Sequence, residues 1–111
     1  MDCIVCKIAK EEIKSKKVYS DENFFAFHDI NPQAPVHILI IPKKHISKLS
    51  DTNDKNILGE MLILANKIAK ESGISETGYR IVINTNKDAG QSVDHLHLHL
   101  LGGRIMKWPP G

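Results

Sequence analysis

Hydrophobic and polar residues alternate strictly near the end of the chain, in the run His95-Leu96-His97-Leu98-His99-Leu100. A period of two is the pattern of a β-strand, so the histidines are expected to share one face and the leucines the other. A core strand whose polar face is histidine by chance is the less favoured interpretation, because threonine or lysine would serve there equally well. Imidazole suits nucleophilic attack, proton transfer near neutral pH and metal binding. This strand is therefore expected to carry the chemistry of the protein.

Four further strands and a short helix are predicted before it. Two prolines within residues 31–35 exclude regular structure there, and they separate an aromatic-rich strand from a nearly all-apolar one. The all-apolar strand is expected at the centre of the sheet, buried on both faces. The predicted elements are a helix over residues 4–13 and strands over residues 17–20, 24–30, 36–42 and 79–84.

One long helix is predicted over residues 54–72, where Asp51 to Asp54 offer N-caps and Gly73 a C-cap. Its apolar residues cover an arc of about 160°, whereas a helix packed on one surface needs only ~100°. The excess width predicts two neighbours, the protein's own sheet and a second copy of the chain. The residues on the arc are Ile57, Leu58, Met61, Leu62, Leu64, Ala65, Ile68 and Ala69, and Ile63 lies off it. These elements predict an α+β fold with about five mostly antiparallel strands.

Composition narrows the class of protein. The 111 residues predict a single domain, residues 1–111, and 41% hydrophobic with 25% charged residues is ordinary for a soluble globular protein. The net charge of +2 comes without a basic tract, so no nucleic-acid polymer is expected as a partner. No stretch approaches the ~20 apolar residues that span a bilayer, so we expect no membrane association and a cytoplasmic location.

The spacing of the three histidines limits their role. Alternate residues of a strand lie ~6.6 Å apart, so the outer two histidines are expected ~13 Å apart. Metal–nitrogen bonds are only ~2.0–2.1 Å long, so all three cannot bind one ion. One histidine acting as nucleophile, with the others orienting or protonating around it, fits this geometry better.

Cys3 and Cys6 form a Cys-x-x-Cys pair at the start of the chain. In a reducing compartment this pair indicates metal or redox chemistry more than a structural disulfide. A zinc site needs four ligands, and histidines must supply the other two because there are no other cysteines. Two unligated thiols on a helix remain the alternative.

The run from His95 to Leu101 resembles the signature of the histidine-triad (HIT) superfamily, His-x-His-x-His followed by two apolar residues. The flanking Gly90-Gln91-Ser92, Gly102-Gly103-Arg104 and Trp108-Pro109-Pro110-Gly111 resemble its Hint branch of nucleotide-binding proteins. The resemblance extends over essentially the whole chain. It implies a HIT-like fold and a homodimer whose two sheets join into one of ten strands.

The resemblance also implies an activity, the hydrolysis of purine nucleoside phosphoramidates such as AMP-NH2 or AMP-lysine. His97 would attack the α-phosphorus and form a covalent nucleotidyl-histidine. His99 would stabilise the phosphoryl oxygen, His37 would support this group, and Ser92 would hydrogen-bond or protonate the leaving atom. No cofactor is implied for catalysis.

Two sets of binding residues follow from the same resemblance. Asp29, at the end of a predicted strand, would accept hydrogen bonds from both ribose hydroxyls. A structural zinc ion would be held by Cys3, Cys6, His45 and His95. The implied purine nucleotide site comprises Phe27, Asp29, Ile30, Asn84, Gly90, Gln91, Ser92, Val93, His97, His99 and Trp108.

Three rival functions stay open at this stage. An AMP- or GMP-binding regulatory module would bind the same ligand with little turnover. A dinucleoside polyphosphate hydrolase of the Fhit-like branch would use the same triad, although the Trp-Pro-Pro-Gly ending favours Hint. A catalytic zinc ion on the triad is disfavoured by the ~13 Å separation of the outer histidines.

Overall fold

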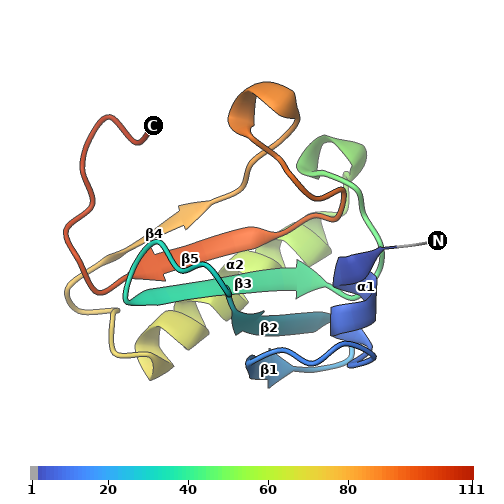
Figure 1. The fold of residues 1–111 in the computed structure, drawn as a ribbon, viewed down its shortest axis with the longest axis horizontal. Coiled ribbons are helices and arrows are strands. Elements are labelled where there is room, and N and C mark those ends of the chain that lie inside the picture. Colours follow the sequence, from blue (N-terminus) through green and yellow to red (C-terminus); the bar gives the residue numbers. More distant parts are fainter. Residues whose placement is uncertain (1–2) are drawn as a thin grey trace.

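The computed structural model describes residues 3–111, which form one antiparallel sheet with a helix on each side (Figure 1). In chain order the elements are α1 (Ile4–Ala9), β1 (Lys17–Ser20), β2 (Phe24–His28), β3 (Val36–Pro42), η1 (Leu49–Asp51), α2 (Lys55–Glu71), β4 (Tyr79–Val82), η2 (Lys87–Ala89) and β5 (Leu98–Gly102). Within this part of the chain, no helix combines the length and the apolar content needed to cross a membrane.

The five strands lie in the order β1-β2-β3-β5-β4, and every neighbouring pair is antiparallel. The all-apolar strand β3 is central, as its sequence predicts, and β5 lies beside it with Leu39 opposite His99. The predicted fold class is therefore confirmed. Both edges of the sheet are strands that pair on one side only, β1 and β4.

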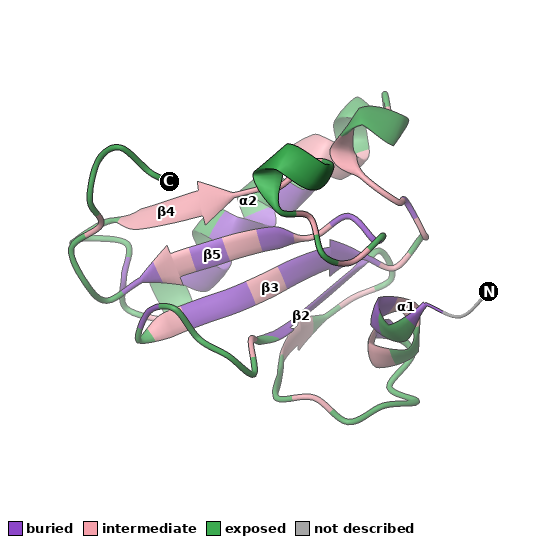
Figure 2. Cartoon of the chain, turned by 45° about the horizontal axis from the view of Figure 1, so that its top comes forward, coloured by how far each residue is buried: buried purple, intermediate pink, exposed green. Residues whose placement is uncertain are grey.

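Burial alternates along β5, as its colours in Figure 2 show, and the buried side chains of the sheet belong to two clusters. On β2, Phe24 and Ala26 belong to the main core with the helix α2, whereas Phe25 and Phe27 pack with α1. The leucines of the triad run lie in the main core, as the period of two predicts. The histidine side of β5 therefore lies on the same face of the sheet as α1.

The helix α2 covers one face of the sheet, behind it in Figure 1. Asp54 is its N-cap and accepts hydrogen bonds from the backbone amides of Asn56 and Ile57. Gly73, just past the end, has the left-handed φ of 76° that favours glycine. Leu62 and Ile63 are exposed, at 44% and 68%, on the surface that the main core leaves uncovered.

Several predicted elements are longer than the observed ones. The first helix ends at Ala9 because the chain turns into the left-handed region at Glu11, where φ is 60°. The second strand ends at His28, because the Asp29 carboxylate accepts the amide of Asn31 and turns the chain. The fourth strand ends at Val82, opposite His99, since its only partner begins at Leu98.

The triad strand also begins later than predicted, at Leu98 instead of His95. The backbone amide of Leu96 donates to the carbonyl of Ile46, 2.6 Å away, and not to a neighbouring strand. The carbonyl of His95 meets the side chain of His97. Residues 95–97 therefore continue the alternation of faces without joining the hydrogen-bonded sheet.

Candidate functional site

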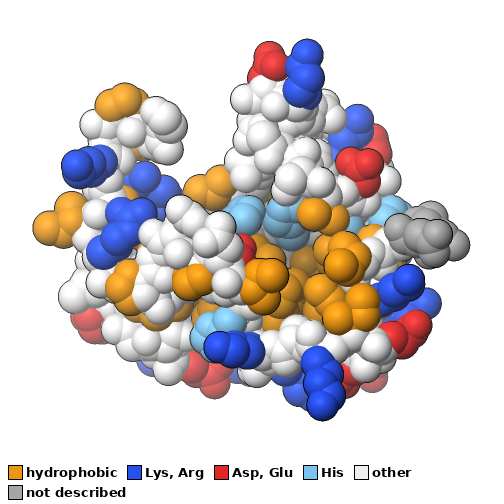
Figure 3. Space-filling view, viewed as in Figure 1, with side chains coloured by type: hydrophobic (Ala, Val, Ile, Leu, Met, Phe, Trp, Pro, Cys, Tyr) orange, Lys and Arg blue, Asp and Glu red, His pale blue; other side chains and the backbone are white. Residues whose placement is uncertain are grey.

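The histidines of the triad take part in two separate clusters. Histidine side chains are visible near the middle of one face of the molecule, beside exposed hydrophobic atoms (Figure 3). His95 lies with Cys3, Cys6 and His45, and His99 lies with His37 and Asp29. His97 stands between them, with its ring centroid 5.1 Å from that of His99.

His97 and His99 open onto a pocket of about 160 Å³. Its floor is apolar and comes from α1, β2 and β3, whereas its polar side chains come from the triad run and the loops around it. A small apolar cavity with a few polar groups is the usual form of a ligand site. The lining residues are Val5, Phe27, Asp29, Leu39, Ile41, Ser92, Val93, His97 and His99.

The ring of His97 is oriented by the main chain. Its Nδ1 lies 2.7 Å from the carbonyl oxygen of His95. A carbonyl oxygen only accepts, so Nδ1 carries the hydrogen and Nε2 of the neutral ring keeps its lone pair. His97 therefore presents an unprotonated nitrogen from a fixed ring, which is what a nucleophile requires.

His99 is held by a second histidine. Its Nδ1 lies 2.9 Å from Nε2 of His37, whose Nδ1 in turn accepts the backbone amide of Gln33 at 3.0 Å. Burial, together with the neighbouring rings of His97 and His37, lowers the pKa of His99 to about 4. Burial also lowers the pKa of His37, against a smaller opposing effect of Asp29. Both rings are accordingly neutral at physiological pH.

Asp29 lies at the rim, immediately after β2. One carboxylate oxygen accepts the amide of Asn31 at 2.8 Å, and the other lies 3.4 Å from Nε2 of His37. Its side chain is 19% exposed and lines both the histidine pocket and a neighbouring hollow. An ionised carboxylate in this position can still accept hydrogen bonds from a ligand.

The second cluster has the donors of a zinc site. The ligating atoms of Cys3, Cys6, His45 and His95 all lie within 4.8 Å of one another. The three sulfur–Nδ1 contacts are 3.3 to 3.4 Å long. Tetrahedral zinc with bonds of about 2.3 Å to sulfur and 2.0–2.1 Å to nitrogen separates such donors by roughly 3.6 Å. The four residues therefore fit a structural zinc ion.

The hydrogen bonds around this cluster agree with a metal site. Nε2 of His95 lies 2.8 Å from the carbonyl of Pro42, so it carries the hydrogen and leaves Nδ1 free to bind metal. His95 is completely buried, and burial lowers its pKa, which favours the neutral, ligating form. Burial and the neighbouring Cys3 raise the pKa of Cys6, a thiol that a bound metal would deprotonate.

The other residues predicted to bind nucleotide lie in different parts of the structure. Ser92 and Val93 line the histidine pocket, and Gln91 anchors their loop by donating to the carbonyls of Ser47 and Val93. Gly90 only turns the chain before this loop, with a φ of 79°. Ile30 is 97% exposed and lines the neighbouring hollow together with Asp29 and His37.

Asn84 and Trp108 line a separate surface pocket, between β4 and the C-terminal tail. Trp108 is 81% exposed, and its ring lies 5.9 Å from the guanidinium carbon of Arg80. Neither side chain is among those that line the pocket of His97 and His99.

The sequence patterns did not identify some residues that line or support the pocket. Leu39 and Ile41 share the face of His37, so the alternation along β3 already contained that information. Val5 reaches the pocket from α1, and the amide of Gln33 meets His37 from the proline loop. No sequence pattern indicates these two contacts, because one depends on how a helix docks and the other on the backbone of a loop.

Comparison with known proteins identifies the family. The model of the HIT domain matches residues 10–106. The chain belongs to the HIT family. A HIT family hydrolase from Legionella pneumophila Philadelphia 1 has 55% identity and a TM-score of 0.97, covering 99% of this chain and 100% of that one. The predicted family and fold are thus confirmed.

Two further relatives of this HIT protein bear on its sites. A histidine triad nucleotide-binding protein from Candida albicans has 37% identity and a TM-score of 0.84, covering 97% of this chain and 83% of that one. The 14 kDa zinc-binding protein of Zea mays is 53% identical over 109 residues, 95% of this chain and 84% of the maize protein.

Proposed function

We propose that this HIT protein hydrolyses purine nucleoside 5′-phosphoramidates through a covalent nucleotidyl-His97 intermediate. The observation that carries the proposal is the 2.7 Å contact between Nδ1 of His97 and the carbonyl of His95, which leaves Nε2 free to attack. The relatives described as a HIT family hydrolase and a nucleotide-binding protein support the reaction class and the ligand class.

The pocket suggests how the nucleotide is bound. Its volume of about 160 Å³ is smaller than the ~300–1,000 Å³ of sites for whole drug-sized ligands, so it takes one part of the nucleotide. The purine ring occupies the apolar floor beside Phe27. The ribose hydroxyls donate to Asp29 at the rim, which places the phosphate near His97 and His99.

In the first step, the Nε2 lone pair of His97 forms a bond to the α-phosphorus and the P–N bond to the amine breaks. The leaving nitrogen takes a proton from water through the Ser92 hydroxyl, at the edge of the same pocket. His99 donates from Nε2 to the phosphoryl oxygen that gains negative charge. Because His99 is neutral and its Nδ1 accepts from His37, whose own Nδ1 accepts the Gln33 amide, Nε2 of His99 carries this hydrogen.

In the second step, water attacks the phosphorus of the nucleotidyl-histidine. The new P–O bond replaces the N–P bond, and the electron pair returns to Nε2 of His97. The proton of the water passes to solvent and the nucleoside monophosphate leaves. Dividing one displacement into two is the advantage of covalent catalysis.

Zinc has a structural role in this proposal. When bound to Cys3, Cys6, His45 and His95, the ion would supply four bonds that join α1 to the turn after β3 and to the run before β5. All four protein donors would be used, so the coordination is closed to substrate. Catalysis itself requires no metal.

We also propose a homodimer in which two β4 edges join the sheets into ten strands. The edge strand β4 pairs only with β5, and the exposed Leu62 and Ile63 lie on the outer side of α2. The exposed Trp108 on the tail beside β4 is then available to a partner's site.

The test measures turnover of adenosine 5′-phosphoramidate by the wild type, His97→Ala and Glu22→Ala, with and without chelator. Glu22 is exposed in the turn between β1 and β2 and serves as the control. We expect His97→Ala to lose roughly 10⁴-fold or more in kcat and Glu22→Ala to match the wild type. Equally slow rates in all three proteins would leave a nucleotide-binding module instead of an enzyme.

A further inference from the structure

The hydrogen bonds behind His99 run in one direction. The chain of bonds begins at the backbone amide of Gln33, which lies 3.0 Å from Nδ1 of His37. A backbone amide can only donate, so Nδ1 of His37 must accept. A neutral imidazole has a single N–H, and in His37 that hydrogen is therefore on Nε2.

The same reasoning passes to the next ring. Nε2 of His37 donates to Nδ1 of His99, 2.9 Å away. Nδ1 of His99 is thus an acceptor, and the hydrogen of this neutral ring is on Nε2. One peptide group outside the pocket therefore decides that His99 offers a donor, and not a lone pair, to whatever the pocket binds.

The bond direction also argues against a metal at this position. The donor atoms of Asp29, His37 and His99 lie within 4.8 Å of one another, as in a metal site. However, Nε2 of His37 carries a hydrogen as long as Gln33 donates to Nδ1, so this nitrogen has no lone pair for an ion. Asp29, His37 and His99 are therefore arranged as a hydrogen-bonded group and not as a set of metal ligands.

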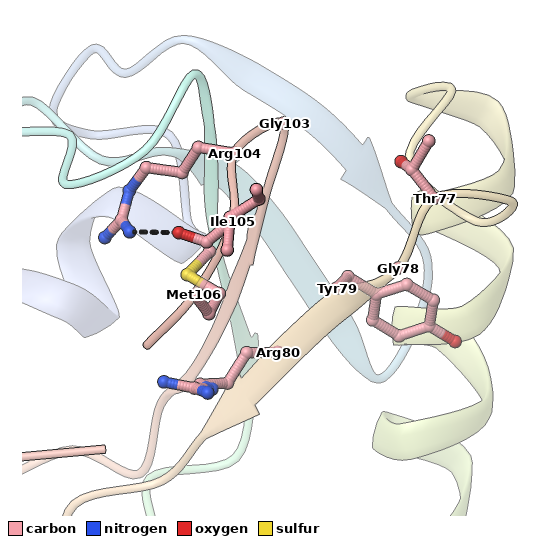
Figure 4. Close-up of a pocket in the computed structure, with 8 residues that line it drawn as sticks. All are labelled: Thr77, Gly78, Tyr79, Arg80, Gly103, Arg104, Ile105 and Met106. Atoms are coloured by element: carbon pink, nitrogen blue, oxygen red, sulfur yellow. Dashed lines mark hydrogen bonds between the residues drawn. The ribbon is translucent and has the colours of Figure 1, made fainter. Parts of the chain in front are cut away.

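Gln33 is itself held at its carbonyl, which belongs to the peptide group that follows the donating amide in the chain. Nε of Arg104 donates to the carbonyl oxygen of Gln33 at 3.0 Å. Arg104 follows β5, the strand that carries His99, and Figure 4 shows its guanidinium group turned toward the carbonyl of Ile105, its second acceptor. The arginine thus ties the proline loop to the end of the catalytic strand.

The backbone at this junction permits the contact. Gly103 has a φ of 90°, which favours glycine, and a Cβ atom there would lie 2.9 Å from Cβ of Pro35. The loop and the strand end therefore approach more closely than any other residue would allow. This approach brings Arg104 within reach of Gln33.

We propose that Arg104 is a positioning residue, which holds the residue Gln33 at its carbonyl so that the backbone amide of Gln33 fixes His37 and, through it, keeps His99 as a hydrogen-bond donor. The inference rests on the proposed function for its catalytic consequence. Without the hydrogen bond from Arg104, the Gln33 amide is free to move away from His37. The rings of His37 and His99 can then exchange tautomers. In the reversed arrangement Nε2 of His99 presents a lone pair to a phosphoryl oxygen and repels it.

The test uses ¹⁵N NMR of the histidine rings in the full chain without substrate. The variant is Arg104→Met, which keeps the aliphatic stem and removes the donors, and Arg104→Lys is the second variant if the first does not fold. Arg80→Ala is the control for this readout, because it removes a guanidinium group from the same surface pocket, one that bonds to Lys107 instead (Figure 4). We expect the wild type and Arg80→Ala to show His99 with its hydrogen on Nε2, and Arg104→Met to show mixed tautomers.

The kinetic arm measures adenosine 5′-phosphoramidate turnover. We expect Arg104→Met to lower kcat roughly tenfold with KM changed less than about twofold, as for an orienting partner outside the site. A wild-type tautomer pattern in Arg104→Met, or a change in KM alone, overturns the inference. If the wild type shows no turnover, the proposed function fails while the NMR result still decides whether Arg104 sets the tautomer.

Discussion

The two histidine clusters of this HIT protein use the same side chain for opposite purposes. His95, with Cys3, Cys6 and His45, is completely buried and surrounded by metal-binding atoms. His97 and His99 face a pocket that a ligand can enter. Only one residue separates His95 from His97, so the alternation of faces along the run does not explain the difference.

The partner of the second ring nitrogen explains it. In His95, Nε2 donates to Pro42 and leaves Nδ1 for a metal. In His97, Nδ1 donates to a carbonyl and leaves Nε2 as a lone pair, and in His99, Nδ1 accepts and leaves an N–H. A histidine's role as ligand, nucleophile or donor is thus set by the group behind the ring.

The largest expected effect on stability comes from removing one ligand of the Cys3, Cys6, His45 and His95 cluster. With zinc at 1,000 times its dissociation constant, binding stabilises the wild type by about 4 kcal/mol, and Cys6→Ser should lose most of this. The measurement is thermal melting with added zinc and with chelator. The variant should melt alike in both conditions, whereas equal zinc shifts in the variant and the wild type would contradict a site at these four residues.

Removing the hydrogen-bond donor His99 is expected to impair catalysis in the cluster of His37, His99 and Asp29. His99→Ala should lower kcat for adenosine 5′-phosphoramidate by roughly 10²–10³-fold, because the phosphoryl oxygen loses its hydrogen bond in the transition state. The KM should change little. Steady-state kinetics beside the control Glu22→Ala measure the effect, and a raised KM with normal kcat would show that His99 only binds the ground state.

The rim of the pocket can be tested with a modified substrate. Asp29→Asn should weaken the wild-type preference for ribose over 2′-deoxyribose, and it should cost roughly tenfold in kcat/KM with the ribose substrate. The measurement compares both proteins with both substrates. Identical discrimination by wild type and variant would remove Asp29 from the ribose site.

The smallest expected effect is on stability in acid. Because the pKa of His99 is lowered from 6.5 to about 4, the unfolded chain binds more protons than the folded one between these values. Stability should therefore fall as the pH drops below about 6.5, and His99 should account for about 1–2 kcal/mol between pH 7 and pH 5 after screening is allowed for. In urea unfolding, His99→Gln should lose less stability than the wild type between pH 7 and pH 5, and an equal loss in both proteins would contradict this assignment.

The sequence allowed the fold to be predicted because its patterns are local. The alternation from His95 to Leu100 assigned both faces correctly, and Asp54 and Gly73 marked the ends of the long helix. The start of β5 was wrong, because the bond from Leu96 to Ile46 depends on a turn about fifty residues earlier in the chain. Pairing between distant segments leaves no periodic signal.

The candidate site was predictable only where residue type is tied to chemistry. Cysteine and histidine side chains are recognisable metal ligands in a sequence, and the structure brings Cys3, Cys6, His45 and His95 together. A backbone donor such as Gln33 has no residue signature, since any amino acid except proline supplies the same amide. Asn84 and Trp108 line a separate pocket, so their contact with nucleotide stays a prediction.

His95 contributes its ring to one cluster and its main-chain carbonyl to the other. Every amino acid has that carbonyl, so the nucleophile makes no demand on the side chain at this position. A lineage can therefore gain or discard the metal-binding set by changing side chains alone, while the orientation of His97 is inherited through the backbone. The two sites adjoin in space and remain separable by mutation.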